Sequence, residues 1–302
     1  VCWFAVPRGG FTRGFFGSVR CVYDTGYVST PAYIAAKRAG VPIVIHEQNA
    51  RPGLANKVGA RNAAVVALTF PSSPLAARSG QTVVTGLPLR SAIADLAERR
   101  ASTEGAGAAR REAAERLGVN PDAPTLLVTG GSLGALHVNE SMTGGADALP
   151  EGAQVIHLTG RGKDEPVRKA VEAAGLSDRW HVIDYLTTME DALAVADLVV
   201  CRSGAGTVAE MEALGLPCIY VPLPIGNGEQ RLNAADHVAA GGAQLIDDKD
   251  FTAEFVRRNV FPLLGSTRLA DMAAASQSLG RAGAARALAD LALAQVKEGG
   301  HE

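Results

Sequence analysis

The sequence is short of cysteine, of net charge and of long apolar runs, and each shortage excludes a class of protein. Its four cysteines form no C-x-x-C pair and show no other metal-ligand spacing, which suits reduced thiols in a cytoplasmic protein. No apolar stretch approaches the roughly 20 residues that span a bilayer. Residues 1–25 also lack the continuous apolar segment of a signal peptide, so we expect a protein that is neither secreted nor membrane-spanning.

The charge balance argues against a polyanionic partner. The formal net charge is -2 and the isoelectric point is near 6.4, which gives no overall electrostatic reason to bind nucleic acid. With 47% apolar and 20% charged residues, the 302-residue chain has the composition of a globular protein and the length of two ordinary domains.

From Tyr27 onward, helical patterns alternate with short apolar runs, which favours a parallel sheet covered by helices on both faces. The first series has a helix at 31–39 and strands at 41–45, 64–67 and 82–84. The second has strands at 125–129, 154–158, 181–183, 198–201, 218–221 and 243–246, and ends with an amphipathic helix at 284–297. Residues 95–118 are charged and alanine-rich, and they indicate a helix or hinge between domains rather than core.

The first 24 residues have neither the period of a strand nor that of a helix. Their mixture of aromatic residues, arginine and glycine is compatible with an RGG-type nucleic-acid segment. The neutral overall charge favours the other interpretation, a truncated or wrongly translated edge of a domain.

The stretch from Asp197 to Ile225 is the most informative in the chain. The apolar run Leu198–Cys201 predicts a buried strand, which breaks at Arg202-Ser203-Gly204 before a helix that we expect to open at Thr207. The first turn of a helix leaves unpaired N–H groups and a partial positive charge. This junction therefore predicts a site for a phosphate or diphosphate that needs no metal.

A glycine loop, Gly130–Ala135, follows the predicted strand at 125–129. Its glycines let a ligand approach the backbone, and Ser132 adds a hydroxyl donor for an anionic oxygen. Glycines at such a turn are equally common for purely geometric reasons, so this motif alone leaves both interpretations open.

Glu210 has two competing interpretations. In the first, Thr207-x-x-Glu210 is a capping box, in which the glutamate only holds the helix end. In the second, the Glu210 carboxylate lies beside a bound diphosphate and accepts hydrogen bonds from ribose hydroxyls. The pattern by itself does not separate the two.

Polar residues His46-Glu47-Gln48-Asn49 come after the predicted strand at 41–45. Ligands of α/β folds bind at the carboxyl ends of parallel strands. A single histidine there is more often a structural hydrogen-bonding group, but a run of four polar residues favours a site.

Two other polar segments have simpler explanations. The loop Gly226–Asn233 suits a solvated turn that caps the next helix. Asp248-Lys249-Asp250 offers two carboxylates to Mg²⁺, but a turn leading to an N-cap at Thr252 is the favoured interpretation. No nucleophile elbow, Walker A loop or H-E-x-x-H helix supports a simple hydrolase or a kinase.

Six motifs, in this order, closely resemble the MurG family, the peptidoglycan N-acetylglucosaminyltransferases of bacteria. They are GYVSTPAY (Gly26–Tyr33), VPIVIHEQNARPGLAN (Val41–Asn56), TGLPLR (Thr85–Arg90), GGSLGA (Gly130–Ala135), CRSGAGTVAE (Cys201–Glu210) and PIGNGEQRLNA (Pro224–Ala234). The resemblance covers nearly everything from Gly26 to the end of the chain.

The resemblance implies an α/β fold of the GT-B glycosyltransferase type, with two Rossmann-like domains facing a cleft and the first domain incomplete. It divides the chain into an acceptor and membrane-side domain at 1–95, a donor-binding domain at 96–275, and a C-terminal helix at 276–302 that packs back towards the first domain. The implied reaction moves N-acetylglucosamine from UDP-N-acetylglucosamine to the C4 hydroxyl of undecaprenyl-linked lipid I, with inversion, to form lipid II. It implies no cofactor and no tightly held metal, and it places the protein at the cytoplasmic face of the bacterial membrane, on the inner membrane surface.

Site residues follow from the same resemblance. Asn49, Arg90 and Ser132 correspond to donor-binding positions, and Leu186 to the position whose backbone reads the uracil. Residues Ala205, Gly206, Thr207, Val208, Ala209 and Glu210 correspond to the stretch around the nucleotide, with Glu210 on the ribose and Gln230 on the sugar. His46 and Glu47 are the candidates for the base that takes the acceptor proton.

The chain also departs from the family pattern. The family begins with a glycine-rich loop, GGTGGH, that serves the acceptor, and no such segment occurs here. Leu87 also stands where many members have asparagine. Two alternatives stay open at this point: a UDP-N-acetylglucosamine epimerase of the same architecture, against which the HEQN and GEQRLNA motifs count, and a donor-binding remnant that does not transfer the sugar.

Overall fold

The structure, a computed structural model, describes residues 2–4, 20–22, 29–131, 134–225 and 227–298. The chain forms two compact units, one of residues 1–89 with 281–302 and the other of residues 90–280. They are called the first and the second unit below. The predicted domain limits at 95 and 275 stay predictions.

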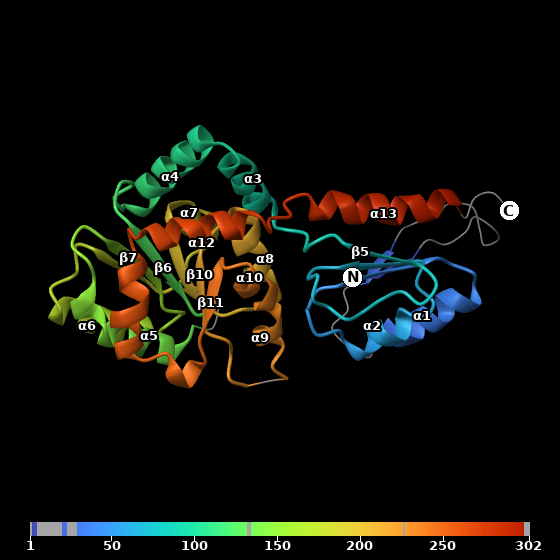
Figure 1. The fold of residues 1–302 in the computed structure, drawn as a ribbon, viewed down its shortest axis with the longest axis horizontal. Coiled ribbons are helices and arrows are strands. Elements are labelled where there is room, and N and C mark those ends of the chain that lie inside the picture. The colour runs from blue at the N-terminus through green and yellow to red at the C-terminus, as the bar shows by residue number, and fades with distance from the viewer. Residues whose placement is uncertain (1, 5–19, 23–28, 132–133, 226, 299–302) are drawn as a thin grey trace. The chain divides into compact units, whose positions relative to one another are not determined.

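The second unit is built on a six-stranded parallel sheet in the order β11-β10-β9-β6-β7-β8 (Figure 1). Its strands are β6 (Thr125–Thr129), β7 (Gln154–Leu158), β8 (Trp180–Ile183), β9 (Leu198–Cys201), β10 (Cys218–Tyr220) and β11 (Ala243–Leu245). All six were predicted, with ends that agree within one residue. Successive strands run outward from β6 on one side and from β9 on the other, so the order reverses between β6 and β9. Doubly wound sheets bind their ligands at such a reversal, beside the carboxyl ends of the strands.

Helices precede, connect and follow these strands. They are α3 (Ser91–Arg100), α4 (Thr103–Leu117), α5 (Leu136–Gly144), α6 (Asp164–Ala173), α7 (Met189–Val195), α8 (Ala205–Leu214), α9 (Glu229–Asn233), α10 (Ala235–Ala239), α11 (Ala253–Phe255) and α12 (Thr267–Gln277). The predicted N-cap at Thr252 is confirmed, because its hydroxyl accepts a hydrogen bond from the backbone N–H of Phe255 at 3.2 Å.

Residues 95–118 were predicted to form a helix or hinge rather than core. The exclusion from the core is wrong. Residues of this stretch form the end of α3 and all of α4, and α4 packs against α7. Ala109, Ala113 and Ala114 lie on one face of α4 and are buried. These small side chains let α4 approach α7 closely. The buried face was not recognised in the sequence because its alanines stand among many charged residues. Arg110 adds a bidentate ion pair with Asp197, with N–O distances of 2.8 and 3.0 Å.

The first unit has a five-stranded sheet in the order β2-β1-β3-β4-β5. The strands β3 (Ile43–Glu47), β4 (Val65–Leu68) and β5 (Gln81–Val84) are parallel, which confirms the pattern expected after Tyr27. Before them, β1 (Cys2–Phe4) runs antiparallel to both β2 (Arg20–Val22) and β3. Residues 5–19, which include the RGG-type segment, lie outside the described residues.

Three helices complete the first unit: α1 (Ser29–Arg38), α2 (Leu54–Gly59) and α13 (Ala284–Glu298). The amphipathic helix predicted at 284–297 is confirmed as α13, and its Leu288 is buried in a cluster with Val44, Val65 and Ala67 of the sheet. Among the residues described in the two units, no helix combines the length and the apolar character that a membrane crossing requires.

Candidate functional site

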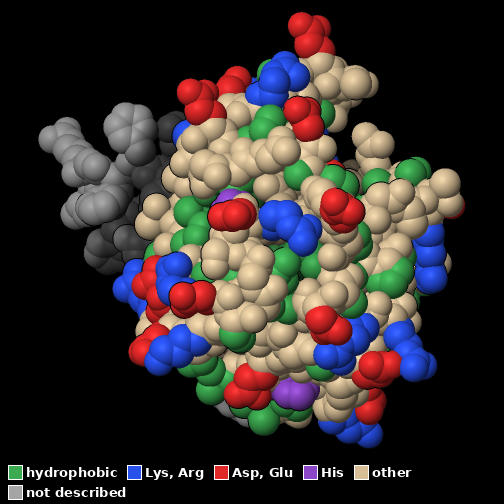
Figure 2. All heavy atoms as spheres, turned by 90° about the vertical axis from the view of Figure 1, so that its left-hand side faces the viewer, with side chains coloured by type: hydrophobic (Ala, Val, Ile, Leu, Met, Phe, Trp, Pro, Cys, Tyr) green, Lys and Arg blue, Asp and Glu red, His purple; other side chains and the backbone are tan. Residues whose placement is uncertain are grey.

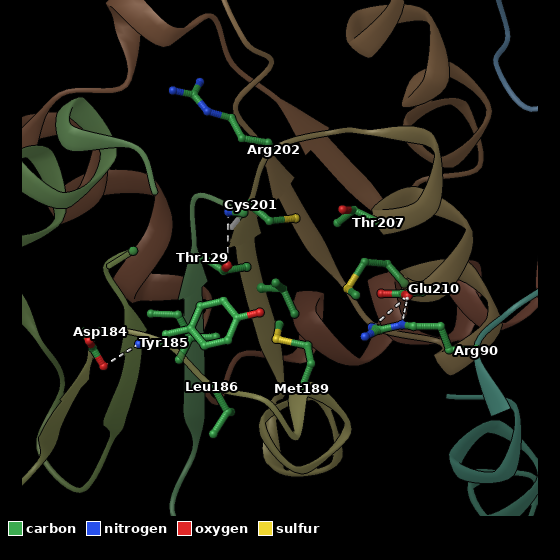
Figure 3. Close-up of a pocket in the computed structure, with 15 residues that line it drawn as sticks. Arg90, Thr129, Asp184, Tyr185, Leu186, Met189, Cys201, Arg202, Thr207 and Glu210 are labelled. Carbon is green, nitrogen blue, oxygen red and sulfur yellow. Dashed lines mark hydrogen bonds and ion pairs between the residues drawn. The ribbon is translucent and has the colours of Figure 1, made fainter. Parts of the chain in front are cut away.

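A cavity of about 240 Å³ opens in the second unit where the strand order reverses. Its wall is made by the carboxyl ends of β6, β7 and β9, the loop after β8 and the start of α8 (Figure 3). The lining residues are Arg90, Thr129, Gly131, Leu158, Gly160, Asp184, Tyr185, Leu186, Met189, Val199, Cys201, Arg202, Thr207, Glu210 and Met211. The cavity therefore occupies the place at which this topology binds its ligands.

The start of α8 forms one side of the cavity. The helix begins at Ala205, and its N-cap is Gly204, which provides no side chain to bond the first amides. A Cβ added at Gly204 or Gly206 would meet nothing within 4 Å. A ligand can therefore approach the backbone at the start of this ten-residue helix, where the first N–H groups have no partner within the helix and no side-chain cap.

The capping-box interpretation of Glu210 is wrong. Because α8 begins two residues earlier than predicted, Thr207 is its third helical residue and not its N-cap. The Glu210 carboxylate bonds instead to Arg90, whose Nε and Nη2 donate to Oε1 at 3.2 and 3.0 Å (Figure 3). Glu210 is thus free of the helix end, and both side chains line the cavity.

The Arg90–Glu210 pair is unequal in exposure. The Arg90 side chain is 58% exposed, whereas that of Glu210 is 17% exposed. Burial raises the pKa of Glu210 above its ordinary value, and the charge and hydrogen bonds of Arg90 oppose that effect. Both hydrogen bonds go to one oxygen, so Oε2 has no partner among the described residues and can accept hydrogen bonds from a ligand.

The loop after β8 forms the opposite side. Asp184 accepts the backbone N–H of Tyr185 at 2.7 Å, and Tyr185 and Leu186 both line the cavity (Figure 3). The guanidinium of Arg161 lies 4.1 Å from the centre of the Tyr185 ring, a cation–π contact. An aromatic ring and a backbone segment therefore stand where the resemblance places the uracil.

The glycine loop after β6 is shaped by close approaches. A Cβ on Gly130 would lie 2.2 Å from the backbone nitrogen of Ala135, and one on Gly134 would lie 2.2 Å from the carbonyl oxygen of Thr159. Gly131 lines the cavity and has open space at its Cβ position. The loop thus needs glycine for geometry and also faces the cavity, so the two interpretations of this motif are compatible. Ser132 lies outside the described residues.

The acidic pair at 248 and 250 has a structural explanation. Arg202 donates to Asp248 at 2.5 Å and to the carbonyl oxygens of Val221 and Pro222 at 2.9 and 3.0 Å. Asp248–Asp250 forms a 3₁₀ turn just before the Thr252 cap, as the favoured interpretation predicted. No group of three or more potential metal ligands occurs within the part of the chain that the structure describes.

The structure brings together only some of the predicted donor residues. Arg90, Leu186, Thr207 and Glu210 line the cavity. Val208 and Ala209 have buried side chains, so they can reach a ligand only through their backbone. Gln230 does not line the cavity, and its Oε1 accepts the backbone N–H of Leu223 at 2.9 Å.

Several cavity residues were missed or misjudged in the sequence. Cys201 was predicted only as the last residue of a buried strand, and it is buried but also lines the cavity. Thr129 and Arg202 lie at the ends of predicted strands, and their place at the carboxyl end of each strand was the available signal.

In the first unit, His46 and Glu47 are the last two residues of β3, whereas the prediction placed them after the strand. His46 is buried, and its Nε2 lies 2.9 Å from the carbonyl oxygen of Gly86 and 3.3 Å from Oγ1 of Thr69. A carbonyl accepts only, so Nε2 carries the proton and Nδ1 holds a lone pair with no hydrogen-bond partner among the described residues. Burial lowers the pKa of His46 to about 4, although the bond to Gly86 opposes the shift.

Glu47 is placed to stabilise a loop, and its role as a catalytic base stays a prediction. It is 3% exposed, and its carboxylate accepts hydrogen bonds from Asn49 N and Gly53 N at 3.0 Å and from Asn56 Nδ2 at 2.9 Å. Two donors from the loop after β3 and one from α2 satisfy this buried carboxylate. Asn49, predicted to bind the donor, is the first of them.

Two family models match the sequence. The glycosyltransferase family 28 C-terminal domain matches residues 125–291, which is more than half of the chain, and the N-terminal domain of the same family matches residues 18–68. The first match contains every cavity-lining residue except Arg90.

Curated relatives are similar over most of the chain. A protein of Bifidobacterium longum named UDP-N-acetylglucosamine–N-acetylmuramyl-(pentapeptide) pyrophosphoryl-undecaprenol N-acetylglucosamine transferase is 48% identical over 280 residues, which are 87% of this chain and 70% of the relative. A protein of the same name from Streptomyces coelicolor is 48% identical over 258 residues, which are 85% of this chain and 67% of the relative.

Solved structures agree. The crystal structure of Acinetobacter baumannii MurG has a TM-score of 0.71 at 28% identity and covers 89% of this chain and 71% of that one. A Listeria monocytogenes structure described as a UDP-N-acetylglucosamine 2-epimerase has a TM-score of 0.63 at 18% identity, a likeness of fold alone. The fold is GT-B. The chain belongs to glycosyltransferase family 28 and, within it, to the family of the UDP-N-acetylglucosamine–N-acetylmuramyl-(pentapeptide) pyrophosphoryl-undecaprenol N-acetylglucosamine transferases.

Proposed function

We propose that the chain transfers N-acetylglucosamine from UDP-N-acetylglucosamine to the C4 hydroxyl of undecaprenyl-linked lipid I, with inversion, and so forms lipid II for peptidoglycan synthesis. The observation that carries this proposal is the 48% identity to transferases of that name, in a chain whose cavity lies at the strand reversal. The named substrates of the relatives are a nucleotide sugar and a lipid-linked muramyl acceptor, and the cavity residues suit the first of them.

The donor would span the cavity, with its diphosphate at the start of α8 and its uracil at the loop after β8. The amides at the start of α8 and the glycine loop with Ser132 would hold the diphosphate, and Arg90 would add a positive charge. Oε2 of Glu210 would accept the ribose hydroxyls. The backbone of Leu186 would read the uracil beside Tyr185.

The remaining donor contacts rest on the resemblance. Asn49 of the first unit and Gln230 of α9 are proposed to bind the donor, with Gln230 on the sugar. In the structure, Gln230 offers its amide nitrogen, because its oxygen already accepts the N–H of Leu223.

Stabilising the departing diphosphate is the largest task in an inverting transfer. The acceptor hydroxyl attacks the anomeric carbon while the bond to UDP breaks, and negative charge grows on the diphosphate. Amides fixed at the end of a ten-residue helix need no reorganisation to meet that charge. The acceptor proton needs a base, and His46 and Glu47 are the proposed candidates, as the resemblance implies.

The undecaprenyl chain of the acceptor places the reaction at a membrane, so we propose a peripheral protein on the cytoplasmic face of the cell membrane. Helix α1 offers a suitable surface, because Ile34 is 46% exposed and lies on it near Lys37 and Arg38. A patch of apolar and basic side chains suits anionic lipid headgroups.

The face of the second unit seen in Figure 2 carries acidic and basic side chains interspersed, with no large patch of either sign. Pairs such as Arg168–Asp164 and Lys169–Glu165 on α6 alternate in the same way. This face therefore offers no footprint for nucleic acid.

A product assay tests the proposed function. The purified chain is incubated with radiolabelled UDP-N-acetylglucosamine and a lipid I analogue, and the products are separated by chromatography. We expect label in the disaccharide lipid. Label in a UDP-linked epimer would indicate an epimerase, and calorimetric binding of UDP-N-acetylglucosamine without any product would indicate a donor-binding protein; either result contradicts the proposal.

A further inference from the structure

A line of polar groups crosses the apolar core of the second unit and ends at the cavity wall. Trp180 Nε1 lies 3.3 Å from His157 Nδ1, His157 Nε2 lies 3.0 Å from Asn139 Oδ1, and Asn139 Nδ2 lies 3.1 Å from the carbonyl oxygen of Thr159. All four residues are buried. Their surroundings are aliphatic side chains such as Val138 and Val155.

The direction of every bond in this line is fixed by its two ends. An indole N–H only donates, so His157 Nδ1 must be the acceptor and Nε2 must carry the proton. That proton faces Asn139 Oδ1, which leaves the amide NH₂ of Asn139 to donate to the carbonyl of Thr159. Burial lowers the pKa of His157 to about 3, so the imidazole is neutral at any physiological pH.

The last group of the line lies directly behind the cavity wall. Thr159 does not line the cavity itself, but it lies between Leu158 and Gly160, both of which do. Its carbonyl oxygen is also the atom against which the glycine loop packs, since a Cβ on Gly134 would lie 2.2 Å from it.

Asn139 connects this point to a third part of the site. It lies in the first turn of α5, the helix that follows the glycine loop directly. Its single amide therefore links the start of α5 to the end of β7, at the atom where the glycine loop crosses. A bond at that junction fixes the spacing between the loop and the wall opposite.

We propose that Asn139 and His157, oriented by Trp180, are positioning residues of the donor site: they hold the Thr159 carbonyl, and through it Gly134, in the position that the diphosphate site needs. The inference rests on the proposed function, because it assumes that the cavity takes UDP-N-acetylglucosamine. Residues that orient a binding group through a buried hydrogen bond affect affinity without touching the ligand.

A second buried network provides a matched comparison. Tyr220 Oη and His237 Nδ1 are 2.8 Å apart, and His237 Nε2 and Ser276 Oγ are 2.7 Å apart. These side chains are as buried as those of the line, and the hydroxyl of Ser276 contacts the carbonyl oxygens of Leu216 and Gly242 at 3.2 Å. None of these residues lines the cavity. Breaking this network should cost stability and leave donor binding unchanged.

The test compares Asn139→Asp with Ser276→Ala in the full chain. The carboxylate introduced by Asn139→Asp keeps an acceptor for His157 but faces the Thr159 carbonyl with an oxygen instead of an N–H donor. We expect the dissociation constant for UDP-N-acetylglucosamine, measured by calorimetry, to rise about tenfold or more in Asn139→Asp and to stay within twofold of wild type in Ser276→Ala. Thermal unfolding is expected to shift down in both. Equal affinity in the two variants would overturn the proposal.

A milder variant covers the case in which Asn139→Asp does not fold. Trp180→Phe removes only the indole donor and keeps an aromatic ring beside Phe261. The dissociation constant should rise here too, by a smaller factor, because His157 can then adopt its other tautomer. An unchanged dissociation constant in folded Trp180→Phe would contradict the proposal.

Nitrogen NMR of ¹⁵N-histidine-labelled wild type tests the orientation itself. His157 should keep the Nε2–H tautomer from pH 5.5 to 8, and a titration or an Nδ1–H signal would refute the inference. Failure of the proposed function is distinguishable, because it appears in wild type, as missing disaccharide lipid or missing donor binding, whereas failure of this inference appears only as unchanged donor affinity in the variants or as the wrong His157 tautomer.

Discussion

Replacing Glu210 with alanine separates a residue that binds ligand from one that holds a helix. The side chain makes no contact with the helix cap, and its described partner is Arg90. With Arg90 58% exposed, the ion pair contributes only about 0–1 kcal/mol to stability. A loss of 1 kcal/mol lowers the melting temperature by about 2–4 °C in a unit of this size, so we expect a shift no larger than that.

The expected effect on binding is larger. A carboxylate that accepts hydrogen bonds from ribose hydroxyls contributes about 1.5–3 kcal/mol, because one partner is charged. At 1.4 kcal/mol per tenfold change, removing it should weaken UDP about 10- to 100-fold. Isothermal titration of UDP into wild type and Glu210→Ala measures this change.

A matched control is Glu112→Ala, which breaks an exposed pair with Arg99 at 2.8 Å. This pair does not line the cavity, so the UDP dissociation constant should not change. If Glu210→Ala lowers the melting temperature well beyond the control and leaves the UDP dissociation constant intact, Glu210 is structural and the reasoning fails.

The same residue gives a pH dependence of binding. Burial raises the pKa of Glu210, so its carboxylate becomes protonated at a higher pH than that of an ordinary glutamate. Only the ionised form provides a charged acceptor, so UDP affinity should fall as the pH is lowered through that raised pKa. Glu210→Gln should bind more weakly at neutral pH and lack this acid limb; an identical limb in the variant would assign it to another group.

Three further predictions concern neighbouring features. Gly134→Ala should abolish most UDP binding, whereas Gly118→Ala, which has the same φ of 67° but open space at its Cβ, should cost only the backbone strain of about 1 kcal/mol by chemical denaturation. Arg161→Ala should weaken UDP by about two- to fivefold in calorimetry, because the cation–π contact that holds the Tyr185 ring is worth about 0.5–1 kcal/mol; unchanged affinity would mean that the ring needs no support. Burial lowers the pKa of His237 to about 4, so on acidification the unfolded chain binds the His237 proton at a higher pH than the folded chain does. The contribution of His237 to the free energy of unfolding should therefore be complete above about pH 6.5. It should fall by about 1.4 kcal/mol per pH unit as the pH drops towards 4. His237→Gln should lose that part of the acid sensitivity in denaturant titrations at pH 7 and pH 5.5.

The strands of the second unit could be read from the sequence because a parallel strand covered on both faces is a short, continuous apolar run. Leu198–Cys201 is such a run, and all four of its residues are buried. The start of α8 was misplaced because Thr207 and Glu210 have the spacing of a capping box, whereas the actual N-cap is Gly204, which has no side chain that marks a cap in the sequence. The sequence pattern therefore favoured Thr207 over Gly204 as the N-cap.

Side-chain partners were beyond the reach of the sequence. Arg90 and Glu210 are 120 residues apart, and nothing local indicates that they meet. The family resemblance placed both at the donor site but did not indicate that they bind each other. At Glu47 the polar neighbours suggested a ligand site. In the structure, groups of this segment donate hydrogen bonds to the buried Glu47 carboxylate.

Helix α8 is held at two points by arginines at the two ends of one neighbour, α3. Arg90, the N-cap of α3, bonds Glu210, the sixth of the ten residues of α8, and Arg100, the last residue of α3, donates to the carbonyl oxygen of Leu214 at 2.9 Å at the C-terminal end of α8. A cation at the C-terminal carbonyls stabilises a helix and satisfies one of its unpaired acceptors. With its middle and its C-terminal end fixed, the helix holds its first amides, at Ala205 and Gly206, in position before any ligand arrives. Binding energy is then not consumed in ordering them, which is the condition under which backbone amides stabilise a leaving diphosphate effectively.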